Sequence, residues 1–253
     1  KSRKVIDHYI GQDDIIANPP VHHPRMAGVR LPSLSKRKPV VITMHDEYLY
    51  TGHCAYTLGC NRWRTGCGEC PHLDVYPAVK VDNTRYNWMR KKEIFSKSNI
   101  MLVAPSSWLA ERTKYSLLSN LPVCVIPNGI DLDKFKPGSK SAAREILNID
   151  NNAFVIFYAA AGGRRSAFKD YEMLDRVNGR LQGYKFQGKV VLLALGGKQN
   201  RRREFENVIM IEKSYIKDPQ EIVRHYQASD LYIHTAKADN APLVILEAMA
   251  CGK

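Results

Sequence analysis

The sequence predicts an α/β protein of two doubly wound domains, each with a parallel sheet between layers of helices. Three observations support this fold class. The chain has 253 residues, more than the commonest size of a single hydrophobic core. Short apolar runs bounded by Pro, Gly and Asn alternate with polar, helix-like stretches. This alternation stops at one polar segment near residue 137 and then begins again, so two domains are expected.

In the first domain, three apolar and largely β-branched runs predict buried parallel strands, at residues 38–46, 99–106 and 121–129. The stretch between the last two begins with serines that can cap a helix. It then carries Leu109 and, at four-residue spacing, Thr113 and Leu117. The predicted unit is therefore strand, helix, strand.

The second domain is predicted to begin within the polar segment 131–150, which contains Pro137 and Gly138. The boundary is placed between these two residues. Beyond it the sequence predicts strands at 153–161, 189–197, 207–213 and 231–236, and helices at 169–182 and 218–230. Asp218 as N-cap and Pro219 at the first helical position indicate the start of the second helix.

Composition excludes several classes of protein. Hydrophobic residues make up 44% and charged residues 25%, so neither a disordered chain nor a collagen-like fibre is expected. No run of eighteen apolar residues and no apolar N-terminal core occurs, which predicts a cytoplasmic protein. The net charge of +13 favours anionic partners, whether nucleic acid, acidic lipid or nucleotide phosphate. Basic clusters at 35–39, 89–92 and 198–203 are more often solvated faces than binding patches.

The last fifteen residues, DNAPLVILEAMACGK, predict a helix that begins near Pro242 and ends at Gly252. The helix follows a predicted parallel strand, and ligands of open α/β sheets bind at that end of the strands. Asp239 and the amides of Ala241 to Val244 then lie at a helix N-terminus, which favours phosphate. Glu247 has apolar neighbours, so its carboxylate needs hydrogen-bond donors such as the two hydroxyls of a ribose.

Asp239 and Glu247, separated by seven residues and followed by AMACG, resemble the E-x7-E motif of retaining glycosyltransferases of family 4. The first position holds Asp, as in branches that make bacterial surface polysaccharides. Three further stretches resemble family motifs in the family's order: VITMHD (41–46), IPNGIDLDKFKP (126–137) and ASDLYIHTA (228–236). The resemblance covers nearly all of the chain. It implies the GT-B fold, in which two Rossmann-like domains face a cleft.

The resemblance also implies the role of each domain. Residues 1–137 would form the acceptor-side domain, incomplete at its N-terminus and carrying a cysteine-rich insertion at 51–77. Residues 138–253 would form the nucleotide-sugar donor domain, incomplete at its C-terminus. Family members begin with an earlier strand and glycine-rich loop and continue past AMACG.

The resemblance implies a diphosphate-binding site near the start of the donor domain. Gly162 and Gly163 follow a predicted strand, and Arg164 and Lys169 resemble the family's arginine and lysine that hold the donor diphosphate. Arg165 is an alternative to Arg164, and a plain basic loop is the competing interpretation. Two such cations stabilise charge on a departing nucleotide diphosphate and can replace a divalent metal, so no catalytic metal is expected. The further implied donor-binding residues are Tyr215 and Ile216 beside the nucleobase, and Asn240, Ala241, Pro242, Leu243 and Val244.

On the acceptor side, His45 ends a predicted strand and resembles the family's histidine near the reacting sugar and acceptor hydroxyl. We expect it to position and contact the sugar. The family's retaining reaction is described as same-face attack, in which the leaving phosphate oxygen accepts the proton, so general-base catalysis by His45 is not required.

Four of the six cysteines, Cys54, Cys60, Cys67 and Cys70, fall within seventeen residues. The final C-x2-C has the spacing of a zinc knuckle, and two thiols upstream can complete an all-thiolate zinc site. Disulfides or unligated thiols are the alternatives. A chain without an export signal favours metal over disulfide, and a four-ligand site would be structural. This insertion also resembles one found in a colanic-acid-type subgroup of the family, near the acceptor site.

The predicted function is a retaining hexosyltransferase acting from a UDP- or GDP-sugar on a saccharide or lipid-linked saccharide in surface polysaccharide biosynthesis. Its basic clusters would contact anionic lipid at the inner face of the cell membrane. No nucleic-acid partner is expected. The first alternative is a zinc-knuckle nucleic-acid-binding module, which explains the charge and the cysteines but gives Asp239 and Glu247 no role. The second is an inactive relative of the family.

Overall fold

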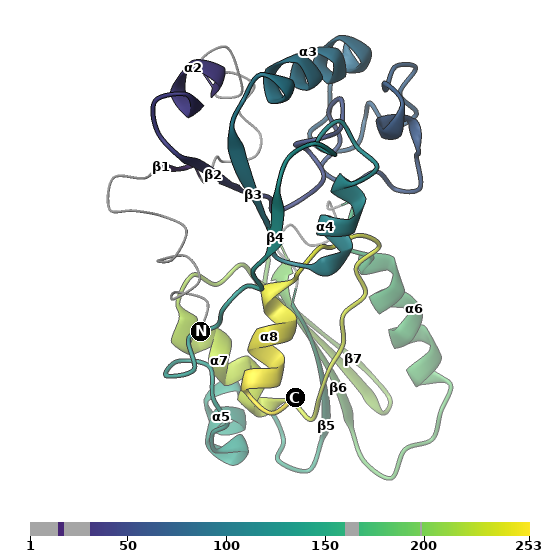
Figure 1. Ribbon diagram of the computed structural model, residues 1–253. Coiled ribbons are helices and arrows are strands. Elements are labelled where there is room, and N and C mark those ends of the chain that lie inside the picture. The colour runs from purple at the N-terminus through teal and green to yellow at the C-terminus, as the bar shows by residue number, and fades with distance from the viewer. Residues whose placement is uncertain (1–14, 18–30, 160–166, 198) are drawn as a thin grey trace. The chain divides into compact units, whose positions relative to one another are not determined.

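A computed structural model describes residues 15–17, 31–159, 167–197 and 199–253 (Figure 1). The chain divides into two compact units. The first is Lys1–Asn128 with Asp239–Ala241, and the second is Gly129–Ala238 with Pro242–Lys253. The division falls before the predicted boundary at residue 137, because Ile130 and Phe135 pack in the core of the second unit.

The first unit contains a four-stranded parallel sheet in the order β1-β2-β3-β4. Its strands are β1 (Ile15–Ala17), β2 (Val40–Thr43), β3 (Ile100–Ala104) and β4 (Val123–Val125). The last three lie inside the predicted runs, and β1 was not predicted. The helices are α2 (Leu31–Ser35), α3 (Thr84–Ser96), α4 (Ser107–Thr113) and the single 3-10 turn η1 (Arg62–Arg64).

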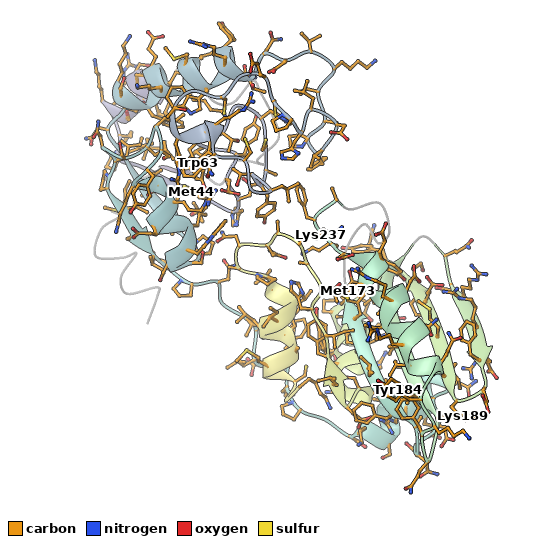
Figure 2. All side chains as sticks on the ribbon, turned by 90° about the vertical axis from the view of Figure 1, so that its right-hand side faces the viewer. Met44, Trp63, Met173, Tyr184, Lys189 and Lys237 are labelled. Carbon is orange, nitrogen blue, oxygen red and sulfur yellow. The ribbon has the colours of Figure 1, made fainter. Side chains whose placement is uncertain are left out.

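The predicted helix after β3 is present as α4, but it ends at Thr113, so Leu117 lies outside it. The Ser106 hydroxyl accepts the Leu109 N–H at 3.2 Å, which satisfies one of the unpaired donors at the helix start. Leu109 and Thr113 are buried, as their spacing predicts. The core of this unit also holds Met44 and Trp63, which lie near one another in Figure 2.

The second unit contains a five-stranded sheet in the order β7-β8-β6-β5-β9. Its strands are β5 (Phe154–Ala159), β6 (Val190–Gly197), β7 (Arg201–Phe205), β8 (Val208–Ser214) and β9 (Leu231–Tyr232). All pairs are parallel except β7 with β8. The basic stretch 198–203 therefore enters an edge strand that sequence analysis did not predict.

Helices cover both faces of the second sheet. These are α5 (Lys140–Leu147), α6 (Tyr171–Gln182), α7 (Pro219–Ala228) and α8 (Leu243–Ala250). Alternate residues of β5 point to opposite faces. Phe157 joins the cluster that contains Tyr226 of α7 and Ala248 of α8, whereas Tyr158 joins the cluster that contains Leu174 of α6. Figure 1 accordingly shows α6 on one side of the strands and α7 and α8 on the other.

The helix ends agree with the sequence patterns. The carboxylate of Asp170 accepts the Met173 N–H at 3.1 Å, and that of Asp218 accepts the Gln220 N–H at 3.0 Å. Helix α8 ends at Ala250, and Gly252 follows with a φ of 76°, a left-handed conformation that glycine adopts without steric cost.

Among the described residues, no helix has both the length and the apolar character needed to cross a bilayer.

Candidate functional site

The order of strands in the second sheet defines where a ligand is expected. From β5 the chain continues through α6 to β6 on one side, whereas β9 pairs with the other side of β5. The order of the sheet therefore reverses between β5 and β9. In doubly wound sheets, ligands bind outside the carboxyl ends of the strands at such a switch point.

Lys169 is held at this switch point by backbone pairing. Lys169 forms an isolated antiparallel β-bridge with Ala236, which lies four residues after the end of β9. On either side, the Lys237 N–H donates to the Phe168 carbonyl at 2.8 Å and the Asp170 N–H donates to the Thr235 carbonyl at 3.2 Å. Residues 168–170, which lead into α6, are thus paired with the segment that leaves β9. The predicted phosphate-binding lysine lies where the topology places a ligand.

The N-terminus of α8 follows the same segment. Pro242 is its N-cap, and no side chain among the described residues accepts a hydrogen bond from the first turn. The first amides of a helix have no intrahelical partner, and they carry the positive end of the helix dipole. Leu243 is exposed and Val244 is half-buried at this end. The described geometry therefore leaves a helix terminus of the kind that binds an anion.

Glu247 lies one turn further into α8 and is half-buried. The Tyr226 hydroxyl donates to its Oε2 at 2.8 Å and also lies 3.1 Å from the Val244 carbonyl oxygen. Burial raises the pKa of Glu247, while the hydrogen bond from Tyr226 lowers it. One carboxylate oxygen is therefore positioned by a buried tyrosine of α7.

Tyr215 and Ile216 follow β8 directly. Because β8 is parallel to β6 and β5, this end of β8 lies at the same edge of the sheet as the switch point. The Tyr215 side chain is 64% exposed, whereas Ile216 packs against the core. An exposed tyrosine at this edge can stack on a planar ring.

Four predicted donor-binding residues, Gly162, Gly163, Arg164 and Arg165, lie outside the described residues. They fall in the sequence between β5 and Lys169. Their own geometry stays a prediction.

In the first unit, His45 is exposed and follows the carboxyl end of β2. Asp239, Asn240 and Ala241 belong to this unit. The Asn240 side-chain amide donates to the His45 carbonyl oxygen at 3.3 Å, and the Asn128 amide donates to the Ala241 carbonyl oxygen at 3.0 Å. The structure thus brings His45 and Asn240, two predicted site residues, together through the His45 backbone.

Beside His45, Asp46 is buried and its Oδ1 accepts the Tyr48 N–H at 2.9 Å. Burial raises the pKa of Asp46 to about 7, against the opposing effects of that hydrogen bond and of the Lys91 charge. Lys91 belongs to the basic cluster 89–92, yet it is buried in α3 and donates to the Thr51 carbonyl oxygen at 2.9 Å. This lysine is therefore a core residue and no part of a basic surface patch.

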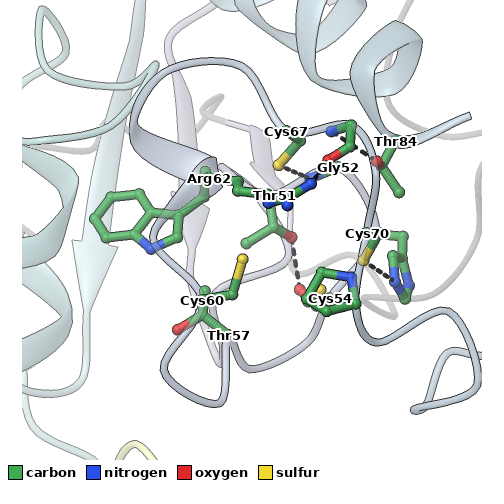
Figure 3. A pocket seen from close by; sticks show the side chains of 13 residues that line it. Thr51, Gly52, Cys54, Thr57, Cys60, Arg62, Cys67, Cys70 and Thr84 are labelled. Carbon is green, nitrogen blue, oxygen red and sulfur yellow. Dashed lines mark hydrogen bonds between the residues drawn. The ribbon is translucent and has the colours of Figure 1, made fainter.

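The four clustered cysteines are free thiols that line one cavity of the first unit (Figure 3). The side chains that come closest there are Cys54, Cys70 and His53, whose ligand atoms all lie within 4.8 Å of one another. His53 was not among the predicted metal ligands, although it directly precedes Cys54.

Tyr226 was also missed. Its position in the helix sequence indicates a core residue, and nothing local shows that its hydroxyl reaches a carboxylate twenty-one residues later. Only the packing of α7 beside α8 reveals this partner.

Comparison with known proteins gives relatives of one kind. No protein-family model matches the chain. The putative colanic acid biosynthesis glycosyl transferase WcaC of Escherichia coli (strain K12) is 25% identical over 217 residues, covering 84% of this chain and 50% of WcaC. A D-inositol 3-phosphate glycosyltransferase of Mycobacterium sp. (strain KMS) is 30% identical over 138 residues, covering 51% of this chain and 30% of that protein. The chain thus spans half the length, or less, of these two curated relatives.

Two solved structures share the fold. Sucrose-phosphate synthase from Thermosynechococcus elongatus aligns with a TM-score of 0.57 at 19% identity, covering 87% of this chain and 51% of that one. Anabaena HepE in complex with UDP and glucose aligns with a TM-score of 0.54 at 21% identity, covering 100% of this chain and 60% of that one. The chain is therefore similar in sequence to bacterial glycosyltransferases, and it has the GT-B fold that its sequence predicts.

Proposed function

We propose that this chain belongs to a retaining glycosyltransferase that moves a hexose from a nucleotide-diphosphate sugar to a saccharide or lipid-linked saccharide acceptor. The product would be a surface polysaccharide or its precursor. The observation that carries the proposal is the hydrogen bond by which Tyr226 orients the half-buried Glu247 in the second turn of α8, the helix that follows β9 in the chain.

The carboxylate of Glu247 is suited to a ribose. The Tyr226 hydroxyl donates to Oε2 at 2.8 Å. Because the carboxylate is rigid and planar, this hydrogen bond also orients Oε1. A carboxylate accepts hydrogen bonds from vicinal hydroxyls, and a half-buried one discriminates strongly against a ligand that lacks them. We assign Glu247 to the ribose and Asp239 to the transferred sugar.

Lys169 and Arg164 are assigned to the diphosphate, together with the first amides of α8. Their positive charge would stabilise the negative charge that develops on the nucleotide diphosphate as the glycosidic bond breaks. This stabilisation replaces what a divalent metal supplies in other transferases, so we propose metal-independent chemistry. Tyr215 would stack on the nucleobase, with Ile216 beneath it.

On the acceptor side, we assign His45 to sugar contact and the leaving phosphate oxygen to accepting the proton from the acceptor hydroxyl. The sequence similarity to WcaC, named for colanic acid biosynthesis, supports a saccharide acceptor in polysaccharide assembly. HepE has been solved in complex with UDP-glucose, which makes UDP-sugars the first donors to test. The basic chain would bind an anionic membrane surface peripherally.

A thermal-shift panel of UDP-, GDP- and ADP-sugars tests donor binding. A ligand that binds only the native state at one hundred times its Kd adds about 2.7 kcal/mol of stability. We expect one nucleotide class to raise the melting temperature of the wild type, and Glu247→Ala and Lys169→Ala to lose this response. Lys185→Ala, at an exposed lysine of the same unit, is the matched control and should keep it.

Stabilisation by duplex DNA that disappears with added salt, without any response to nucleotide sugars, would contradict the proposal and favour the nucleic-acid-binding alternative. The retaining outcome needs its own measurement, because binding does not report stereochemistry. NMR of the first-formed product should show the anomeric configuration of the donor sugar, and an inverted product would refute this part of the proposal.

A further inference from the structure

The cysteine-rich insertion encloses a small cavity that the proposed transfer reaction does not use. It is lined by His53, the four clustered cysteines and Trp63, among others. Its volume is about 20 Å³. This is space for a single small ion or water. In Figure 3, dashed lines join the Cys67 sulfur to the Gly52 N–H and the Cys70 sulfur to the His53 ring.

The imidazole of His53 is oriented as a metal-binding histidine is. Its Nδ1 lies 3.2 Å from the Pro77 carbonyl oxygen, and its Nε2 lies 3.3 Å from Cys70 Sγ. A neutral imidazole that donates Nδ1–H to a carbonyl carries its lone pair on Nε2. A hydrogen bond of this kind fixes the tautomer and the ring orientation of metal-ligating histidines. His53 is 3% exposed, so its ring is held in place.

The turn between Cys67 and Cys70 has a strained backbone. Cys67, Gly68 and Glu69 have φ angles of 52°, 96° and 47°, three successive left-handed residues of which two are not glycine. Such residues cost free energy and persist where the surroundings over-determine them. The Gly52 N–H points at Cys67 Sγ across 3.3 Å, so this sulfur is already an acceptor.

Charge balance also indicates an anionic centre. The buried side chain of Lys91 donates to the Thr51 carbonyl oxygen at 2.9 Å, two residues before His53 in the chain. A Zn²⁺ ion with three thiolates and one neutral imidazole carries a net charge of −1. A buried charge is stabilised by a partner of opposite sign, and Lys91 would supply it.

We propose that this cavity binds one Zn²⁺ ion through Nε2 of His53 and the Sγ atoms of Cys54 and Cys70, which lie within 4.8 Å of one another, with Sγ of Cys67, which lines the same cavity, as the fourth ligand. The histidine takes the place of Cys60 in the all-thiolate set predicted from sequence. Three thiols lose their protons to solvent when the ion binds. With four protein ligands the site has no open position, so it stabilises the insertion and takes no part in catalysis.

Metal content measured on the full chain tests this inference, independently of any transferase activity. After exposure to zinc and gel filtration, the wild type should carry about one zinc per chain, as a four-ligand site requires. Cys70→Ser and His53→Ala should lose it, whereas Cys60→Ser and Cys124→Ser should keep it. Cys124 is the matched control because it is a half-buried thiol of β4, outside the insertion.

Cobalt substitution of the wild type supplies a second measurement in case a variant fails to fold. Tetrahedral Co²⁺ with three thiolates should give an intense sulfur-to-metal charge-transfer absorption that zinc then displaces. A wild type without stoichiometric zinc, or with fewer than six thiols after denaturation and chelation, would overturn the site. Loss of zinc in Cys60→Ser with retention in His53→Ala would overturn the assignment of His53 and restore the four-thiolate set.

Discussion

At the scale of single residues, the hydrogen bond from Tyr226 to Glu247 is the most consequential contact of the second unit. Tyr226→Phe removes it, which should cost about 1 kcal/mol of unfolding free energy. It should also raise the pKa of Glu247 further, because burial raises that pKa and the lost bond lowered it. The acid limb of nucleotide-sugar binding against pH should therefore move to higher pH.

Tyr171→Phe is the matched control for this experiment. The Tyr171 hydroxyl donates to Glu212 Oε1 at 2.9 Å in the same unit, from helix α6. This variant should lose similar stability and leave the acid limb of binding in place. Equal pH profiles for the two variants would show that Tyr226 does not act on Glu247.

Asp46 should make stability depend on pH. Its native pKa of about 7 lies above the ordinary value of 3.8, so between these values the native state holds a proton that the unfolded chain releases. Stability from this group is therefore greatest below pH 4 and is lost as the pH rises toward 7. Asp46→Asn removes the effect and keeps an oxygen for the Tyr48 N–H.

The free energy of unfolding of Asp46→Asn minus that of wild type should thus be on the order of 2–4 kcal/mol larger at pH 8 than at pH 5. Urea unfolding at the two pH values measures it. The exposed Asp74→Asn is the control and should show no such change. A difference between wild type and Asp46→Asn that is the same at both pH values would contradict the shifted pKa.

The sequence could indicate which residues carry charge or thiol chemistry, but not which of them meet. Glu247, Lys169 and the cysteines follow from motif and spacing. Tyr226 and His53 do not, because each acquires its role from a partner that only the folded chain brings near. Lys91 shows the reverse case, since a lysine in a basic run gives no local sign that it is buried.

At the scale of elements, a buried ion pair joins helix α4 to the segment that follows β2. Glu47 is 2% exposed and its Oε1 lies 2.5 Å from Arg112 Nη2. Its two oxygens also accept hydrogen bonds from the Tyr50 hydroxyl and the Thr57 N–H, both at 2.8 Å. A buried carboxylate with this many donors stabilises the structure only while all partners are present.

Glu47→Ala should therefore destabilise the protein by about 3–5 kcal/mol, because it leaves Arg112 without its buried counter-charge. Urea unfolding measures this. Glu111→Ala removes another ion pair of α4, the exposed one with Lys114, and should have little effect. Similar losses of unfolding free energy for both variants would mean that burial does not determine how much the Glu47–Arg112 ion pair contributes to stability.

Long apolar runs predicted strands β2, β3, β5, β6 and β8 because burial on both faces of a parallel sheet demands such runs. Strand β7 escaped prediction because its sequence, RRREF, lacks an apolar pattern and forms only by pairing with β8. Strand β9 is shorter than predicted because the chain turns from β5 after Tyr232 toward Lys169. Tertiary pairing decided both cases.

At the scale of the whole molecule, each unit has its own core, and all three tryptophans lie in the first unit, at residues 63, 88 and 108. Tryptophan fluorescence therefore reports on the first unit alone, whereas far-UV circular dichroism reports on both. In the second unit, the buried Arg144 binds Asp230 Oδ2 at 2.7 Å and the Ala228 carbonyl oxygen at 2.9 Å.

Arg144→Ala should lower the melting transition seen by circular dichroism and leave the fluorescence transition unchanged, because domains with separate cores can unfold separately. Glu47→Ala should do the opposite. If both probes shift together in both variants, the two units unfold as one cooperative body.

The arginines of β7 have a consequence for the protein in concentrated solution. An edge strand presents unpaired backbone groups that can template the strand of another molecule. Two copies meeting along β7 would bring Arg201, Arg202 and Arg203 of each chain close together, and like charges facing one another oppose such contact. We therefore expect part of the surplus positive charge to oppose edge-to-edge association of the described sheet through β7.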